Sequence, residues 1–253
     1  MLRTQIVSDC HLEFYDSIGE SWADRADPTD VDVLIVAGDL AAPPYLLPGL
    51  MTLCQEYPEV VFVAGNHEYY HADPEKVKAG VRNLEAKLDN LHFLDNEVWV
   101  HEGVKFIGTS LWFRPEPGNA LYYKNFTDFV YIKPTGKTSW QWIYEENAKA
   151  LAFLEKEHAD ADVIVTHHVP SNRTVHPRWA NSDLNRFFIC DMSPISQDNN
   201  RHRNWVFGHT HDCWDVTLGK TRLLCNPVGY PNEKRQAEGY KEKLVVEISP
   251  EAK

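Results

Sequence analysis

Short apolar runs separated by longer polar stretches are the dominant pattern of this 253-residue chain. The runs at residues 31–37 and 60–64 are continuous in Val, Ile, Leu, Phe and Ala rather than alternating, which indicates strands covered on both faces. Residues 2–8 and 162–166 are two further strand candidates. Each of these runs ends abruptly in a polar or glycine-containing turn.

Helical periodicity occupies the stretches between these strands. The strongest helix prediction covers residues 138–158, where apolar side chains recur on one face and Glu and Lys on the other. Helices are also predicted at about residues 45–57 and 74–89, the second after an N-cap residue, Asp73, with proline at its first position. The alternation of strand and helix predicts a mixed or parallel sheet with crossover connections.

The rest of the chain predicts hairpins, short strands and two long loops. Hairpins are predicted at residues 98–112 and 215–225, and single strands at residues 204–207 and 243–248. Residues 113–137 and 169–200 have no clear period, and loops of this length are often functional. Because no internal repeat or linker composition occurs, we expect one domain over residues 1–253.

The charge of the chain restricts its partners. The net charge is -12, so the chain has no general electrostatic attraction to nucleic acid or to an anionic membrane. Bound cations could still create a local positive pocket for a phosphate. We therefore expect a small phosphate-ester substrate, with duplex nucleic acid disfavoured. No apolar run reaches the length of a membrane span, so no membrane partner is expected.

The five cysteines indicate the compartment. Their number is odd and no CxxC pair occurs, which fits free thiols in a reducing environment better than a disulfide framework. The first seven residues lack the pattern of a signal peptide. We expect a cytoplasmic protein.

Potential metal ligands follow the predicted strands at the points where the strands end. They are Asp9, His11, Asp39, Asn66, His167, His209 and His211. In a continuing strand the i, i+2 spacing of Asp9 and His11 would turn both side chains to one face and Cys10 to the other, as a buried thiol. His209 and His211 repeat this spacing, and Gly38 before Asp39 permits a close backbone approach.

The number of donors indicates two cations. Three carboxyl or amide oxygens and four imidazoles exceed the ligands of one cation, which number about four to six. Asp39 could bridge two cations through its two oxygens. A mixed Asp, Asn and His set without thiolate favours Mn, Fe, Zn, Co or Ni over a closed structural zinc site. Manganese is the cation that we expect to support turnover in an assay.

Two adjacent cations predict hydrolysis of a phosphoester. Such cations lie roughly 3.5–4 Å apart and clamp an in-line displacement, in which a metal-bridging hydroxide attacks phosphorus. His67 follows Asn66 directly and would project differently, so we assign it to catalysis, as the group that protonates the leaving oxygen.

Several residues near these segments have more than one interpretation. We prefer His167 to His168 as a ligand because it comes first after the strand. Arg173 and Arg178 could contact phosphate in a bidentate manner, but a surface role is the better default. Loop aromatics such as Tyr70 could line a substrate pocket or pack on their own scaffold, and the sequence does not decide between these readings.

The donor segments together resemble the calcineurin-like metallophosphoesterase superfamily. The matching motifs are Asp9-x-His11, Gly38-Asp39, Gly65-Asn66-His67-Glu68, His167 and Gly208-His209-x-His211, in this order. The resemblance implies a metallo-dependent phosphatase-like fold, an α/β four-layer α/β/β/α sandwich with two mixed sheets and the metals at their carboxyl edges. It also implies a division of ligands. Asp9, His11, Asp39 and the final two histidines serve two metals, Asn66 and His167 complete the second, and His67 is acid catalyst or phosphate binder.

A closer likeness is to a subgroup of bacterial and phage phosphoesterases, whose substrates are mostly undefined. The matching stretches are residues 109–112, 127–129, 167–171 and 225–230. Residues 40–43 lack the Asp and Arg that follow the bridging Asp in the protein phosphatase branch, which disfavours a dedicated Ser/Thr protein phosphatase.

We therefore expect a metal-dependent phosphoesterase that acts on a phosphodiester or phosphomonoester of a small molecule or nucleotide. One alternative is a nuclease of the same superfamily, which would need a basic groove that the sequence does not display. Another is a catalytically silent binding scaffold. Loss of ligands is the usual mark of such a scaffold, and no ligand is missing here.

Overall fold

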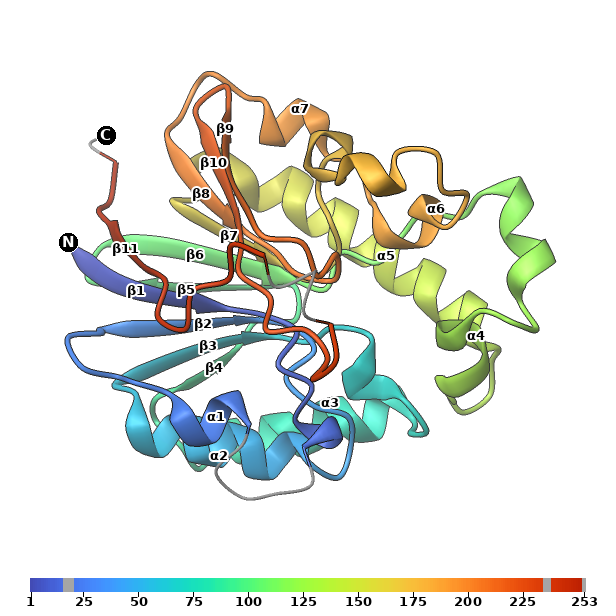
Figure 1. The fold of residues 1–253 in the computed structure, drawn as a ribbon, viewed down its shortest axis with the longest axis horizontal. Coiled ribbons are helices and arrows are strands. Elements are labelled where there is room, and N and C mark those ends of the chain that lie inside the picture. The colour runs from blue at the N-terminus through green and yellow to red at the C-terminus, as the bar shows by residue number, and fades with distance from the viewer. Residues whose placement is uncertain (16–20, 234–237, 252–253) are drawn as a thin grey trace.

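Two β-sheets packed face to face form the centre of the molecule, and helices cover the outer face of each sheet (Figure 1). The computed structural model of the chain describes residues 1–15, 21–233 and 238–251. The arrangement is the four-layer α/β/β/α sandwich that the sequence led us to expect.

The first sheet has five strands in the order β11-β1-β2-β3-β4. Its strands are β1 (Leu2–Val7), β2 (Val33–Ala37), β3 (Glu59–Val63), β4 (Leu91–Phe93) and β11 (Val245–Ile248). Strands β1 to β4 are parallel, and β11 pairs antiparallel with β1. The sheet is mixed, as predicted.

The second sheet has six strands in the order β5-β6-β7-β8-β10-β9. Its strands are β5 (Glu97–His101), β6 (Val104–Thr109), β7 (Val163–Thr166), β8 (Arg203–Val206), β9 (Trp214–Leu218) and β10 (Thr221–Cys225). The four central strands are parallel. Both edge strands are antiparallel arms of the two predicted hairpins, β5–β6 and β9–β10.

The three helices predicted at about residues 45–57, 74–89 and 138–158 are present. The α-helices are α1 (Trp22–Arg25), α2 (Leu46–Glu56), α3 (Pro74–Glu85), α4 (Thr127–Tyr131), α5 (Ser139–Glu157), α6 (Asn185–Phe188) and α7 (Ser193–Ser196). Asp73 caps α3 by accepting hydrogen bonds from two backbone N–H groups of its first turn. Thr138 forms a capping box with Gln141 at the start of α5.

Period-two alternation along the strands divides the core into layers. On β2, Ile35 packs between the two sheets, whereas its neighbours Leu34 and Val36 pack under the helices of the first layer. On β7, Val165 also lies between the sheets, whereas Ile164 faces the opposite helical layer. Each of these fully buried side chains contributes about 1.5–3 kcal/mol of hydrophobic stabilisation, which fixes the positions of the strand ends.

The elements that the sequence pattern missed are short. Strand β4 has three residues with His92 at its centre, so it presents no apolar run. The two expected loops carry helical turns: η3 (Pro117–Tyr122) and α4 in the first, and η5 (Asn172–Thr174), η6 (Pro177–Trp179), α6 and α7 in the second. Helix α3 ends at Glu85, about one turn before the predicted end.

Candidate metal centre

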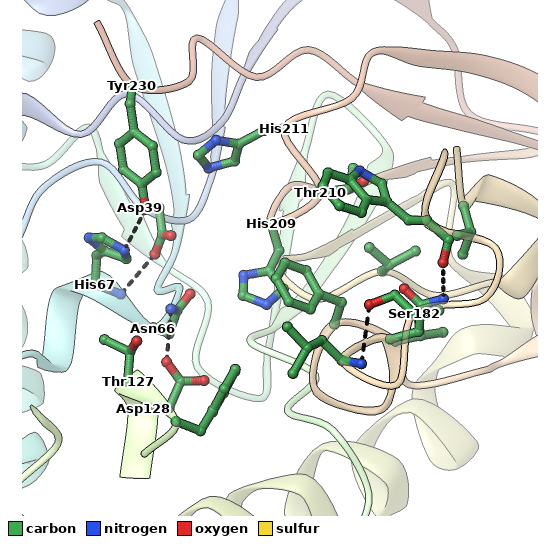
Figure 2. Close-up of a pocket in the computed structure, with 18 of the residues that line it drawn as sticks. Asp39, Asn66, His67, Thr127, Asp128, Ser182, His209, Thr210, His211 and Tyr230 are labelled. Atoms are coloured by element: carbon green, nitrogen blue, oxygen red, sulfur yellow. Dashed lines mark hydrogen bonds between the residues drawn. The ribbon is translucent and has the colours of Figure 1, made fainter. Parts of the chain in front are cut away.

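Polar side chains from both sheets meet at one edge of the sandwich. The segments after β2, β3 and β8 bring Asp39, Asn66, His67, His209 and His211 to a cavity of about 310 Å³ (Figure 2). The carboxyl ends of these strands lie at the same edge because the strands are parallel within their sheets.

Left-handed backbone, rather than continued strand, orients most of these side chains. Strand β1 ends at Val7, and Asp9 and His11 have φ angles of 52° and 47°. Alternation along a continuing strand is therefore the wrong explanation for their common direction. Cys10 is buried in the apolar core, as expected. Asp39, His209 and His211 also have positive φ, at 51°, 68° and 50°, and such strain is characteristic of functional sites.

Gly38 permits the close approach of two strand ends. Its φ is +82°, and a Cβ atom at this position would lie 2.3 Å from the Nδ1 atom of His167. A side chain here would displace that imidazole, so the expected role of Gly38 in backbone approach is confirmed.

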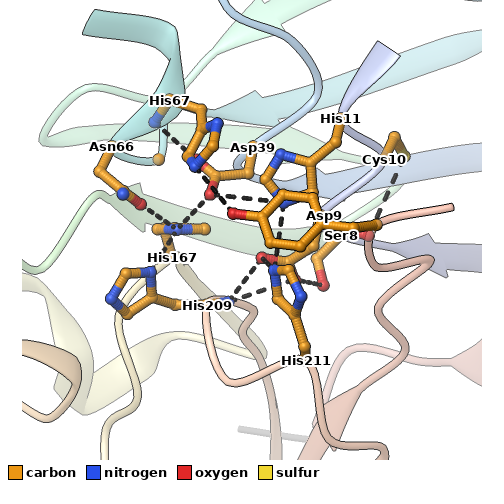
Figure 3. A network of polar contacts seen from close by, with 12 residues as sticks. Ser8, Asp9, Cys10, His11, Asp39, Asn66, His67, His167, His209 and His211 are labelled. Atoms are coloured by element: carbon orange, nitrogen blue, oxygen red, sulfur yellow. Dashed lines mark hydrogen bonds and ion pairs between the residues drawn. The ribbon is translucent and has the colours of Figure 1, made fainter. Parts of the chain in front are cut away.

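Three donors from the two ends of the chain form the first donor cluster, Asp9, His11 and His211 (Figure 3). The Nε2 atoms of His11 and His211 are 3.1 Å apart. The Nε2 atom of His211 is also 3.4 Å from Asp9 Oδ1. Asp9 is further fixed because its carboxylate accepts a hydrogen bond from the backbone N–H of His209.

The second donor cluster comprises Asp39, Asn66, His167 and His209 (Figure 3). Its centre is the Nε2 atom of His167, which lies 3.0 Å from Asn66 Oδ1 and 3.1 Å from His209 Nδ1. The same atom is 3.4 Å from Asp39 Oδ2. All four side chains are buried.

Asp39 lies between the two clusters. Its Oδ2 atom is 3.4 Å from His167 Nε2 and 3.9 Å from His11 Nε2. Burial raises the pKa of this carboxyl, but His167 and His67 beside it more than offset that effect, and the pKa lies well below its usual value. The group is therefore a carboxylate at neutral pH, and it could bind a cation in either cluster.

The donor spacing fits divalent cations. A cation with bonds of about 2.0–2.1 Å to imidazole, at tetrahedral or octahedral angles, separates two nitrogen ligands by about 2.8–3.4 Å. The two histidine pairs, one in each cluster, are both 3.1 Å apart. Such groups of Asp and His can hold metal ions.

Hydrogen bonds on the far side of two donor histidines set the orientation of their rings. The Nδ1–H of His167 donates to the Ala37 carbonyl at 2.9 Å, which leaves Nε2 free to bind. The Nδ1 atom of His211 contacts Glu233 Oε2 at 2.6 Å. Partners of this kind fix the tautomer and ring plane of ligating histidines. Glu233 was not anticipated from the sequence.

Glu68 ties the loops after β2 and β3 together. Its carboxylate accepts backbone N–H groups from Asp39 at 3.1 Å, Ala41 at 3.2 Å and Gly65 at 2.6 Å. Burial and the nearby Asp39 raise the pKa of Glu68 to about 8. The sequence placed Glu68 within a motif but suggested no role for it, because its three partners are backbone groups.

His67 stands beside both clusters and has its own partners. Its Nδ1 atom lies 2.8 Å from Glu13 Oε1, and its Nε2 atom lies 3.2 Å from the Tyr230 hydroxyl. Burial lowers its pKa, but Asp39 and Glu13 outweigh burial and raise it above the usual value. Glu13 and Tyr230 were missed as site residues, although Tyr230 ends a stretch already noted at 225–230.

His168 and Arg178 have partners outside the donor clusters. The Nδ1 atom of His168 contacts the Ser110 carbonyl at 3.1 Å, whereas His167 points its Nε2 into the second cluster. Burial lowers the pKa of His168 to about 3. Arg178 forms an ion pair with Asp212, next to His211.

An α/β sandwich with Asp, Asn and His donors gathered at its strand ends is compatible with a metal-dependent hydrolase. The family model of the calcineurin-like phosphoesterases matches residues 2–213. The chain belongs to this family, and the match supports a phosphoester hydrolase as its class of enzyme.

Two similar proteins align with nearly the whole chain. An uncharacterized protein of Acanthamoeba polyphaga mimivirus is 26% identical, covering 92% of this chain and 93% of its own. The crystal structure of a phosphopantetheinyl hydrolase from Mycobacterium tuberculosis superposes with a TM-score of 0.73 at 21% identity, covering 96% of this chain and 95% of its own. At this identity the second likeness shows the common fold. Within the described residues, no helix is both long and apolar enough to cross a bilayer.

Proposed function

We propose that the protein is a binuclear metal-dependent phosphoesterase. The position of Asp39 carries the proposal, because its Oδ2 atom approaches an imidazole of each donor cluster and could bridge two cations. The first cation would be held by Asp9, His11 and His211, and the second by Asn66, His167 and His209. We place manganese first among the candidate cations, before Fe, Zn, Ni and Co.

The reaction would be hydrolysis of a phosphomonoester or phosphodiester of a small molecule. When bound, two such cations supply Lewis acidity and lower the pKa of a coordinated water. The donor clusters would orient the phosphoryl group at their end of the cavity and limit the access of bulk water to it, because their side chains are buried.

His67 would supply a proton to the leaving oxygen. The Glu13 carboxylate holds the Nδ1–H of its imidazole, so Nε2 faces the cavity side, where it meets the Tyr230 hydroxyl. The hydrogen bond and the negative charge of Glu13 favour the protonated imidazole, as a general acid requires.

The five cysteines support a cytoplasmic setting. All of them are free thiols, and three are buried. Protein thiols persist in this state in a reducing compartment, so we propose that the protein acts there.

Replacing Asp39 tests this proposal. We expect wild-type protein to bind about two cations per chain and to hydrolyse p-nitrophenyl phosphate or bis(p-nitrophenyl) phosphate in Mn²⁺. Asp39→Asn should reduce kcat/KM by at least about a thousandfold, since a binuclear clamp contributes several kcal/mol. Metal content and turnover are measured on the same sample.

A second aspartate provides a matched control. Asp30 has a similar left-handed backbone, with φ 57°, but its side chain is 67% exposed and pairs with Arg3 away from the donor clusters. Asp30→Asn should leave metal content and turnover unchanged. Equal activity of the Asp39→Asn and Asp30→Asn variants, or no turnover by wild type with any of the five cations, would contradict the proposal.

A further inference from the structure

The cavity continues beyond the donor clusters along an apolar face. Six apolar side chains from the segment between β7 and α7 line it, and we call them the apolar wall: Val169, Val175, Trp179, Leu184, Phe188 and Ile189. Phe126 and Tyr70 add aromatic surface to the same cavity. The two stretches without a clear sequence period, 113–137 and 169–200, thus both contribute to it.

The apolar wall begins directly at the second donor cluster. The ring of Phe188 lies against the imidazole of His209, with 4.4 Å between centroids and 32° between planes. A phosphoryl group held by the donor clusters would therefore lie near Phe188, and a substituent that extends from it along this side would meet the apolar wall.

Two members of the apolar wall are exposed in spite of their size. Trp179 and Leu184 remain 44% and 42% exposed. Large exposed apolar side chains that gather at a cavity mark a binding surface. Arg178 fixes this part of the wall, because its guanidinium lies 5.2 Å from the Trp179 ring centroid and pairs with Asp212.

The charges of the cavity are confined to its metal end. Its acidic lining residues are Asp39, Asp128 and Glu233, its basic lining residues are His67, His209 and His211 at the same end, and no Lys or Arg is among the described residues that line it. A second anionic group on the substituent would meet the apolar wall without a lysine or arginine among the described lining residues to pair with, whereas a neutral apolar group would pack against the wall. The volume of about 310 Å³ is at the lower end for a small-molecule site.

We propose that the substrate is a phosphoester of one uncharged, mainly apolar organic group, aromatic or alkyl, and that the apolar wall determines this specificity. The inference rests on the proposed function, because the donor clusters must hold the phosphoryl group for its substituent to reach the wall. Nucleoside polyphosphates, which carry further anionic groups, are disfavoured by the same reasoning.

A series of n-alkylphosphonates tests the chemical class, because their carbon–phosphorus bond is not hydrolysed. Binding of the methyl to hexyl members to manganese-loaded protein is measured by calorimetry. We expect the affinity to rise about two- to fourfold per methylene until the cavity is filled. A 2-carboxyethyl phosphonate, similar in length to the butyl member but charged, should bind no better than methylphosphonate.

Variants of exposed residues locate the effect without disturbing the core. Leu184→Ser and Trp179→Ser should each reduce the hexyl-to-methyl affinity ratio by about fivefold. Leu121→Ser is the matched control, because Leu121 is 82% exposed and does not line the cavity. It should leave the ratio unchanged.

The outcomes separate this inference from the proposed function. An affinity that does not change with chain length, or that favours the carboxyethyl compound, in a protein that hydrolyses aryl phosphoesters overturns the substrate class alone. An equal decrease in the hexyl-to-methyl affinity ratio in the Leu121→Ser variant overturns the role of the apolar wall. A protein that shows the chain-length dependence but hydrolyses no ester with any cation retains the binding inference and loses the proposed function.

Discussion

Asp128 is separated from Asn66 by 62 residues but controls the direction of its amide. The Asn66 Nδ2 donates to Asp128 Oδ1 at 3.0 Å and to the Tyr70 hydroxyl at 2.8 Å, which turns Asn66 Oδ1 toward His167. This contact accounts for the Thr-Asp-Phe stretch at 127–129, to which the sequence assigned no role. A rotated amide would present nitrogen, which is not a metal donor, to the second cluster.

Asp128→Ala should selectively weaken the binding of the cation that we assign to the second donor cluster. Removing a partner that orients a ligand typically costs 10–100-fold in metal affinity, so we expect one of about two cations to be lost on dialysis against a weak chelator. Metal content per folded chain is the measurement. Asp128→Asn can still accept the Asn66 hydrogen bond and should retain more metal, whereas equal retention by Asp128→Ala and wild type would refute the positioning role.

Site residues were predictable from sequence only where they stand in short motifs. The seven donors and His67 each follow an apolar run, so their positions in the sequence were sufficient to identify them as candidate site residues. Glu13, Glu233 and Asp128 act through partners about 20 to 60 residues away, and no local pattern reveals such a contact. The left-handed backbone at Asp9 and His11 was also hidden, because even Asp and His, which are enriched at positive φ, adopt it at only a small fraction of their positions.

Helix α5 is attached to α3 through a buried ion pair. Glu146 is almost fully buried, and its carboxylate lies 2.5 Å from the Nζ atom of Lys78 on α3. Lys149 adds a second contact at 2.6 Å. Burial raises the pKa of Glu146, but Lys78 and Lys149 outweigh burial and bring it below the usual value of 4.5.

Glu146→Gln should therefore destabilise the protein in a pH-dependent manner. Because the folded-state pKa is lowered, the carboxylate stabilises the fold fully above pH 4.5 and loses this contribution as the pH falls through the lowered value. We expect a cost of about 2 kcal/mol at pH 7 in urea unfolding, decreasing below pH 4.5. Glu155→Gln, at an exposed position of the same helix, is the control. A difference between Glu146→Gln and wild type that does not depend on pH would contradict the ion-pair explanation.

At the scale of elements, length decided what the sequence could predict. The buried runs of β2 and β3 and the long amphipathic α5 each carry enough periodic positions to be recognised. Strand β4 and helix α6 have three and four residues, too few for any period, and their structure depends on neighbours such as β3. The segments that form the apolar wall belong to this second kind.

In the whole molecule, each donor cluster joins the two sheets. Asp9 and His11 follow β1 of the first sheet, while His211 follows β8 of the second. The second cluster likewise combines Asp39 and Asn66 with His167 and His209. Bound cations would cross-link the sheets at this edge, where the buried side chains are polar rather than apolar.

Metal removal should consequently lower global stability. A ligand that binds only the folded state at 100 times its Kd contributes about 2.7 kcal/mol, so loss of two cations should lower the Tm by about 10 °C or more. Differential scanning calorimetry before and after chelation, with readdition of Mn²⁺, is the measurement. An unchanged Tm in a protein proved to have lost its cations would show that the clusters do not link the sheets.

The separation of the ligands along the chain also sets the time at which the centre can form. His11 and His211, whose ring nitrogens are 3.1 Å apart, are 200 residues apart in sequence. At a translation rate of about 5–20 residues per second, the first ligands would emerge about 10–40 seconds before the last. During this interval a partial set of Asp and His donors is open to any cation nearby. Correct loading of the proposed centre would therefore follow the synthesis of residue 211, after β8 has joined the second sheet.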